Sequence, residues 1–174
     1  MLKKLLIEQF VIIDKLSLDL QSGLTVLTGE TGAGKSILLD AVGLILGDAA
    51  NPESVRQGAD KSVIEALLAP PPSNPVWKIL TEQGLADPSQ QEFTIRRTIT
   101  PSGKGDVLLG GKSLDLELLK KVGTYLGEIH GQFANQSLLD PTNQRTLLDL
   151  SGAFPPEVFK NVADALHEVE RLTK

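Results

Sequence analysis

The feature that most constrains this chain is a glycine-rich motif, Gly29-Glu-Thr-Gly-Ala-Gly-Lys-Ser36, with the spacing G-x-x-x-x-G-K-S. A short β-type run at residues 24–28 precedes it, and an apolar helical run at residues 37–46 follows, with Gly47 as a plausible helix C-cap. Strand, glycine-rich loop and helix, in that order, are the context in which this motif cradles phosphate. The segment predicts an α/β P-loop fold with a central strand before Gly29 and a buried helix after Ser36.

The residue types in the motif suit the binding of a polyphosphate. Glycine allows successive backbone N–H groups to turn inward, and the following helix points its positive end at the same place. We expect Lys35 to bridge the β- and γ-phosphates of ATP and the Ser36 hydroxyl to bind Mg²⁺. The predicted nucleotide-binding residues of the motif are Gly29, Glu30, Thr31, Gly32, Ala33, Gly34, Lys35 and Ser36.

Other segments predict an antiparallel β layer, because apolar and polar residues alternate along them. The predicted strands lie at residues 2–20 (two strands), 62–68, 92–100 and 106–109, with a further strand at 124–130. Helices are predicted at 76–84, at 114–122 and in part of 136–150. The Arg96-Arg97 pair is expected to be solvated surface on its strand. Gly110-Gly-Lys-Ser113 repeats the Gly-Lys-Ser sequence without the earlier glycine and is predicted to be a turn.

No run of four apolar residues ending in Asp follows the glycine-rich motif, and Leu138-Leu-Asp140 and Leu147-Leu-Asp149 are too short. The acidic residues that support Mg²⁺ and position water therefore have no candidates in this sequence. Two interpretations are open before any family is considered: the chain is a free-standing P-loop kinase or other NTPase, or it is an interaction module whose coiled coil is the functional part. A GTPase would need an Asn-Lys-x-Asp run for guanine, and the sequence contains none.

The last segment has a heptad-like pattern. Its apolar residues follow a 4-3-4-3 spacing at Val158, Val162, Ala165, Val169 and Leu172. This spacing is typical of a coiled-coil seam, although an amphipathic helix packed on the domain would show the same pattern over so short a stretch. We therefore predict an N-terminal lobe over residues 1–152 and the start of a coiled-coil arm over 153–174.

Composition excludes several classes of protein. The chain has no Cys, which removes disulfides, thiolate catalysis and cysteine-based metal sites. Its net charge is 17 − 22 = −5, which argues against a basic nucleic-acid footprint over the whole surface but leaves room for a local patch. No apolar run is long enough to span a membrane and no secretion signal is apparent, so we expect a cytoplasmic protein without a membrane partner.

Four stretches together resemble one family, the structural-maintenance-of-chromosomes (SMC) family of ABC-type ATPases. The stretches are residues 6–14, the region around the motif at 27–41, Val55-Arg-Gln-Gly-Ala59, and Ile129-His-Gly-Gln-Phe-Ala-Asn-Gln-Ser-Leu-Leu139. The resemblance covers nearly the whole chain. The glycine-rich motif is common to many ATPases, so the stretch at 129–139 is the specific part of the likeness.

The resemblance implies an ABC-type ATPase head divided in sequence, of which this chain is the N-terminal half. An antiparallel β subdomain and the start of a coiled-coil helix belong to that half. The C-terminal half of the same head would supply the signature motif, Walker B and the catalytic Glu. Binding of ATP and Mg²⁺ would drive dimerisation with a second head, in DNA double-strand break repair and recombination in the bacterial cytoplasm and nucleoid.

The same resemblance assigns two residues outside the motif. Gln132 would be the Q-loop glutamine, a catalytic residue near Mg²⁺ and the attacking water. A neutral amide suits that role because its oxygen can coordinate a cation while its nitrogen orients water. Arg56 would belong to a loop that reaches nucleotide or DNA.

Overall fold

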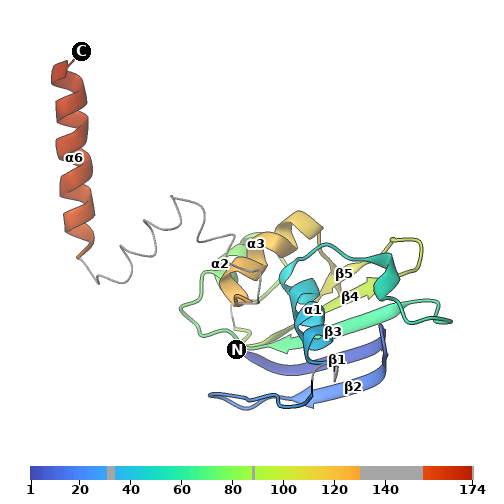
Figure 1. Ribbon diagram of the computed structural model, residues 1–174. Coiled ribbons are helices and arrows are strands. Elements are labelled where there is room, and N and C mark those ends of the chain that lie inside the picture. The colour runs from blue at the N-terminus through green and yellow to red at the C-terminus, as the bar shows by residue number, and fades with distance from the viewer. Residues whose placement is uncertain (31–33, 88, 130–154, 174) are drawn as a thin grey trace. The chain divides into compact units, whose positions relative to one another are not determined.

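A six-stranded sheet forms one layer of the protein (Figure 1). Its strand order is β2-β1-β3-β4-β5-β6, and every neighbouring pair is antiparallel. This confirms the predicted antiparallel β layer. The strands are β1 (Leu2–Phe10), β2 (Ile13–Asp19), β3 (Ser62–Leu68), β4 (Phe93–Ile99), β5 (Val107–Leu109) and β6 (Lys112–Ser113).

The computed structural model describes residues 1–30, 34–87, 89–129 and 155–173. The chain divides into two units, residues 1–129 and residues 130–174, and each is described by itself. Four site predictions, Thr31, Gly32, Ala33 and Gln132, lie outside the described residues, as does the predicted helical segment at 136–150.

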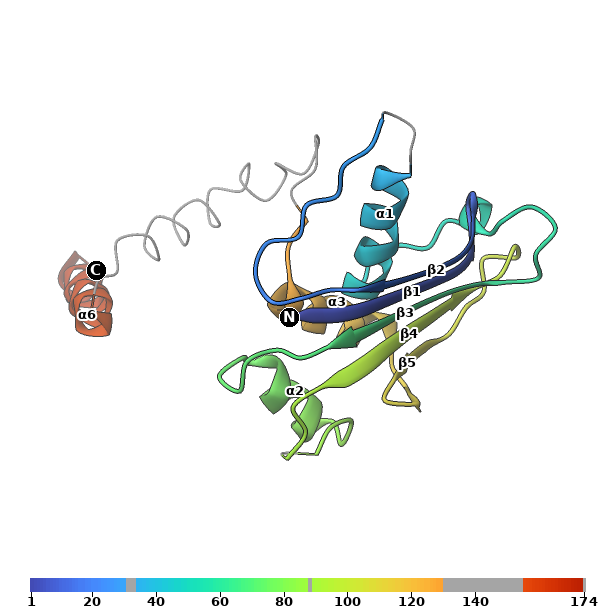
Figure 2. The same ribbon diagram turned by 90° about the horizontal axis from the view of Figure 1, so that it is seen from below.

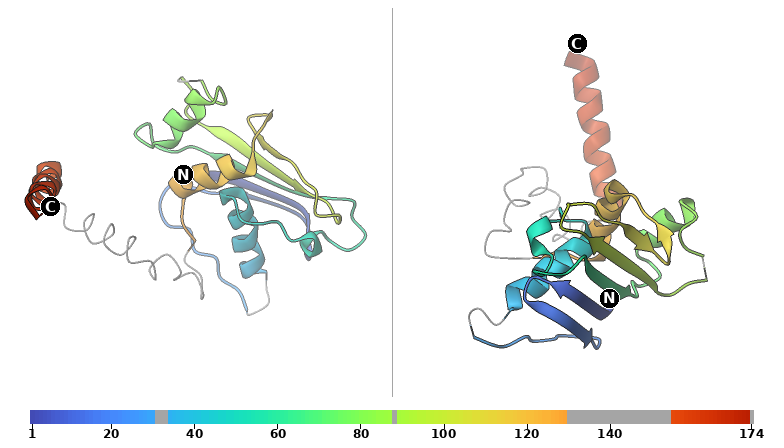
Figure 3. Two further views of the ribbon diagram at one scale, coloured as in Figure 1. Left: turned by 90° about the horizontal axis from the view of Figure 1, so that it is seen from above. Right: turned by 90° about the vertical axis from the view of Figure 1, so that its right-hand side faces the viewer.

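Helices cover one face of the sheet. They are α1 (Lys35–Leu46), the short 3₁₀ helix η1 (Pro52–Ser54), α2 (Val76–Glu82) and α3 (Leu116–Leu126). The helix α1 packs against β3 and β4, α3 packs against α1, and α2 against α3. Figures 2 and 3 show α1 and α3 on the same side of the strands. This layering places α1, which begins at Lys35, on the face of the sheet that carries the core.

The core lies between the sheet and these helices. Side chains alternate along β4, so that Phe93, Ile95 and Ile99 are buried while Arg96 between them is exposed. On α1 the buried residues are Ala41, Gly43, Leu44 and Ile45. Full burial of each large aliphatic side chain stabilises the fold by about 1.5–3 kcal/mol. The C-terminal half of α1 is therefore the part of the helix that anchors it to the sheet.

The opposite face of the sheet carries charged side chains together with apolar ones such as Leu6 and Val63. Cross-strand ion pairs join Glu8 to Lys15 at 2.8 Å, Glu65 to Arg96 at 3.3 Å and Lys4 to Asp19 at 3.8 Å. Such exposed pairs contribute only about 0–1 kcal/mol each. Arg96 is solvated on this face, as expected.

The predicted strand at residues 24–28 is wrong. These residues form no strand in the described part of the chain, and their apolar side chains are exposed, with Leu24 at 91 %, Val26 at 69 % and Leu27 at 50 %. A β-prone sequence becomes a strand only when a neighbour supplies hydrogen bonds, and the six-stranded sheet is paired without this segment. The predicted burial of α1, the helix expected after Ser36, is also only partly confirmed, because the side chain of Leu39 is 47 % exposed.

Two further predictions need correction. Residues 124–126 continue α3 and residues 127–129 are not a strand, because the buried face of α3 at Leu119, Val122 and Gly123 keeps the chain helical through Leu126. His130, the last residue of that predicted strand, lies outside the described residues. In the second Gly-Lys-Ser sequence, Gly110 and Gly111 form the turn, but Lys112 and Ser113 are the strand β6 paired with β5.

The second unit contains the helix α6 (Pro156–Thr173). Its apolar side chains are exposed and include Val158, Val162, Leu166, Val169 and Leu172. Arg171 binds Glu168 one turn earlier through two hydrogen bonds of 2.9 and 2.6 Å. The helical prediction for this segment is confirmed, whereas its role as a coiled-coil arm stays a prediction. In the described ranges, no helix is both long and apolar enough to traverse a lipid bilayer.

Candidate nucleotide-binding site

The site begins where the glycine-rich motif becomes helix α1. Gly34 stands at the N-cap in the left-handed region with φ 86°, and a β-carbon there would meet open space. The first helical hydrogen bond runs from the Leu38 N–H to the Gly34 oxygen at 3.1 Å. The N–H groups of the first turn therefore have no earlier carbonyl within the helix to bind. Glycine is required at position 34 because other residues adopt this φ only with strain.

No side chain of the described residues caps the beginning of α1, and its first turn contains no acidic residue. Many helices satisfy these N–H groups with a Ser, Thr or Asp side chain and place a carboxylate near the positive end of the dipole. Among the described residues of α1, neither a capping side chain nor a first-turn carboxylate fills these roles. An anion at this end of α1 would meet N–H donors and the positive end of the helix dipole together.

Lys35 adds a cation to the same place. Its ammonium donates hydrogen bonds to the carbonyl oxygens of Gly29 and Glu30, the latter at 2.6 Å. The side chain thus folds back over the start of the motif instead of extending into solvent. Ser36, the next residue, is exposed on the first turn of α1. The structure therefore brings together Gly29, Glu30, Gly34, Lys35 and Ser36, as the motif predicts.

These residues fit a nucleotide with its metal ion. A polyphosphate can accept hydrogen bonds from the first-turn N–H groups of α1 and from the Lys35 ammonium. The Ser36 hydroxyl is the side chain that would hold Mg²⁺, a cation that prefers oxygen ligands. When bound, Mg²⁺ neutralises charge that develops on the phosphates.

Arg56 follows η1 in the chain and contacts the turn between β1 and β2. Its backbone N–H donates to Gln9 at 2.9 Å, and its Nη1 donates to the Ile12 oxygen at 3.3 Å. The guanidinium is also 3.8 Å from a carboxylate oxygen of Asp14. The structure thus joins Arg56 to the β1–β2 turn, and its role toward nucleotide or DNA stays a prediction.

Arg97 is a residue that sequence reasoning misjudged. It was expected on the surface, but it is only 5 % exposed, and its Nη1 donates to the carbonyl oxygens of Leu44 at 2.8 Å and Asp48 at 2.7 Å. Burial lowers the pKa of the guanidinium, and the charge of Asp48 partly opposes that shift. The alternation along β4 could have indicated this burial, because Arg97 lies on the same face of the strand as Ile95 and Ile99.

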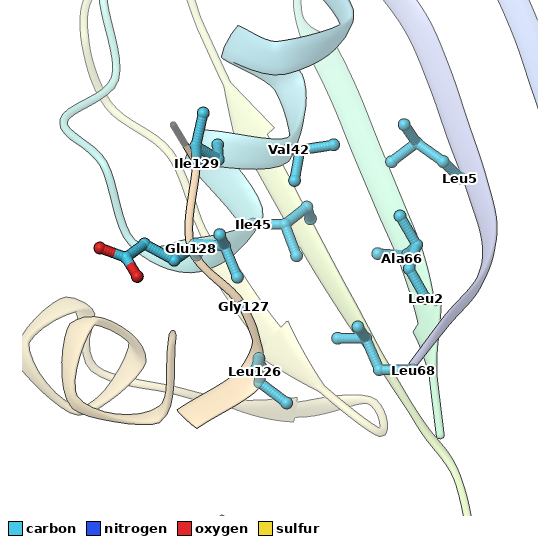
Figure 4. Close-up of a pocket in the computed structure, with 11 residues that line it drawn as sticks. Leu2, Leu5, Val42, Ile45, Ala66, Leu68, Leu126, Gly127, Glu128 and Ile129 are labelled. Atoms are coloured by element: carbon cyan, nitrogen blue, oxygen red, sulfur yellow. The ribbon is translucent and has the colours of Figure 1, made fainter. Parts of the chain in front are cut away.

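An apolar cavity of about 140 Å³ lies on the core side of the sheet (Figure 4). Side chains from β1, β3 and α1 line it together with the segment after α3, and Val42, Ile45 and Ile129 are among them. In Figure 4 the carboxylate of Glu128 points away from the apolar side chains. The cavity offers no cluster of polar groups for a phosphate, so it is no alternative candidate to the beginning of α1.

A P-loop helix beside an antiparallel sheet is the fold of the N-terminal half of an ABC-type ATPase head. A solved relative in fold is the Smc head domain with an extended coiled coil from Pyrococcus furiosus. It is 19 % identical, with a TM-score of 0.67, and the match covers 98 % of this chain and 46 % of that one. At this identity the likeness concerns the fold alone.

The AAA domain family matches residues 4–105, and the chain belongs to that family. It is similar to the DNA repair protein RecN of Bacillus subtilis (strain 168), with 39 % identity over 175 residues, 100 % of this chain and 30 % of the relative. RecN of Halalkalibacterium halodurans is 42 % identical over 158 residues, 90 % of this chain and 28 % of the relative. The chain thus spans less than a third of these relatives and matches their N-terminal part.

Proposed function

We propose that this chain is the ATP-binding part of an SMC-like ATPase head that acts in DNA double-strand break repair and recombination. In the complete protein, ATP and Mg²⁺ bind at the beginning of α1 and drive dimerisation with a second head. Hydrolysis then resets the head. Gln132 positions water beside Mg²⁺, and Arg56 contacts nucleotide or DNA. The protein works in the bacterial cytoplasm, on the nucleoid.

The observation that carries the nucleotide site is the arrangement at the start of α1. The first helical turn has neither a side-chain cap nor an acidic residue among the described residues, and the Lys35 ammonium folds over the carbonyl oxygens of Gly29 and Glu30. Donors and positive charge that converge in this way favour a polyphosphate over other ligands. The assignment to DNA repair is supported by the name that the RecN relatives share.

The exposed segment before the motif supports a C-terminal half as partner. Leu24, Val26 and Leu27 expose apolar side chains in a run of high β propensity, and Leu39 on α1 is exposed as well. Such a run is stable in water only when a neighbouring strand covers it. We infer that the C-terminal half of the head supplies that strand, together with Walker B, the signature motif and the catalytic Glu.

The test compares two lysines of the same local sequence in the complete protein. Lys35→Ala should abolish ATP binding and ATP-dependent dimerisation, because it removes the ammonium from the phosphate site. Lys112→Ala is the matched control, since Lys112 also lies in a Gly-Lys-Ser sequence and donates to a backbone carbonyl, that of Gly84, at 2.6 Å. The control should bind ATP as the unchanged protein does. Equal ATP binding by both variants would contradict the proposed site.

A further inference from the structure

Arg97 holds the far end of the helix that carries the nucleotide site. Among the residues that the structure describes, it is the one charged side chain that is buried. It belongs to β4, where its register partners are Ile64 on β3 and Val107 on β5. An apolar side chain would fill this place at lower desolvation cost, so the charged group calls for an explanation beyond packing.

The contacts of Arg97 lie on both sides of the helix C-cap. Gly47 adopts the left-handed conformation with φ 110°, and its N–H binds the Leu44 oxygen at 3.3 Å while the Asp48 N–H binds the Gly43 oxygen at 2.9 Å. This is the hydrogen-bond pattern of a Schellman motif. The guanidinium of Arg97 then donates to the oxygens of Leu44 and Asp48 from the same nitrogen. One side chain of the sheet therefore fixes both the last turn of α1 and the residue that follows the cap.

The two ends of α1 have complementary roles. At its end near Arg97, carbonyl oxygens concentrate negative partial charge, which the guanidinium satisfies. At its beginning, N–H groups and Lys35 face the phosphate site. Between them lies a single helix of 12 residues, about 18 Å long, with no cis peptide or proline to interrupt it. A shift at one end of such a helix is carried to the other, because packed helices move as rigid elements.

We propose that Arg97 is a positioning residue for nucleotide binding. By tying the end of α1 to β4, it sets where Lys35 and Ser36 stand relative to the sheet and hence to the phosphates. The proposal rests on the proposed function, since it presupposes that α1 begins at the nucleotide site. Small displacements of phosphate-binding groups cost affinity steeply, because several donors must converge on one ligand.

The experiment separates positioning from stability. Arg97→Met removes both hydrogen bonds while keeping a long side chain. Gly84→Ala is the control, because alanine is strained at its φ of 66° while the added β-carbon meets nothing within 4 Å, and Gly84 lies just after α2, away from Arg97. Both variants of the complete protein are titrated with a fluorescent ATP analogue and Mg²⁺, at a temperature where each is fully folded by circular dichroism. We expect Kd to rise about fivefold or more for Arg97→Met and less than twofold for Gly84→Ala.

Equal Kd values in Arg97→Met and the unchanged protein would overturn the proposal, as would equal losses of affinity in Arg97→Met and Gly84→Ala. If the methionine variant does not fold, Arg97→Gln takes its place, because the amide is polar but too short to reach both carbonyls. Its Kd is then compared in the same way with those of the unchanged protein and of the control variant. Lys35→Ala is titrated in parallel. Unchanged binding in that variant means that the proposed function itself fails, whereas lost binding there with unchanged binding in Arg97→Met contradicts only the role of Arg97.

Discussion

Gly123 and Leu46 approach so closely that a β-carbon on the glycine would lie 1.9 Å from the carbonyl oxygen of Leu46. The same is true one residue further along α1, where a β-carbon at Gly47 would lie 2.7 Å from the Cα of Lys120. The backbones of α3 and α1 are thus in direct contact at the C-terminal end of α1. Together with Arg97, which binds Leu44 from the sheet side, α3 holds α1 at its C-terminal end and leaves the beginning of the helix free for a ligand.

Gly123→Ala should destabilise the protein through this contact. The added methyl group meets a backbone oxygen, which cannot move aside as the tip of a side chain could, so α3 must shift away from α1. We expect the free energy of unfolding to fall by about 1–3 kcal/mol, and the melting temperature to fall about 2–4 °C for each kcal/mol. Gly127→Ala is the control, because a β-carbon there meets nothing within 4 Å. Similar melting temperatures for the two variants would contradict the close approach.

Val26→Asp should weaken association with the C-terminal half of the head. Val26 is 69 % exposed, so the change should leave the melting temperature of the chain by itself nearly unaltered. In the assembled head the carboxylate would be buried without a partner, and we expect at least about a tenfold loss of affinity between the two halves. Ile12→Asp is matched in exposure, at 65 %, and lies at the β1–β2 turn. If both variants assemble like the unchanged chain, residues 24–28 do not contact the C-terminal half.

Ser36→Ala should reduce the effect of Mg²⁺ on ATP binding. The hydroxyl is the side chain of the motif that offers oxygen to the cation, whereas the Lys35 ammonium and the helix N–H groups remain. Titrations of the complete protein with ATP, with Mg²⁺ and with EDTA, should therefore differ less in the variant than in the unchanged protein. Ser113→Ala, in the second Gly-Lys-Ser sequence, should keep the full difference. A full Mg²⁺ effect in Ser36→Ala would show that other groups hold the cation.

Residues 1–174 by themselves should bind ATP weakly and hydrolyse it negligibly. Phosphoryl transfer requires stabilised charge on the γ-phosphate and water held in line. We expect Lys35, Ser36 and Gln132 to supply part of this, but the sequence contains no candidate for the Walker B Asp or the catalytic Glu. Addition of the C-terminal half should restore steady-state turnover and ATP-driven dimerisation. Turnover by the chain alone that matches the assembled head, and that Lys35→Ala abolishes, would place a catalytic acid within these residues.

Local patterns predicted much of the antiparallel sheet. Residues 92–100 alternate in polarity and form β4, and the run at 62–68 forms β3. The helix predicted over residues 37–46, with Gly47 as its C-cap, is confirmed as α1 (Lys35–Leu46), which begins two residues earlier. These features depend on neighbours within a few residues, so a single sequence contains the information. The same alternation places Arg97 on the core face, and only the preference of arginine for water suggested otherwise.

The amino-acid sequence by itself determined the proposal of a phosphate site, because the motif consists of consecutive residues that bring N–H groups, an ammonium and a hydroxyl close together in the chain. Only the tertiary structure decided which distant segments pair or make contact. The β-prone run at 24–28 is not a strand, because pairing depends on a partner that no local pattern specifies. Arg97 binds the carbonyl oxygen of Asp48, which lies 49 residues earlier in the chain, and so caps the end of α1. Gly123 lies where α3 touches α1, against the carbonyl oxygen of Leu46. Both contacts depend on tertiary packing, which brings these distant carbonyl oxygens within reach.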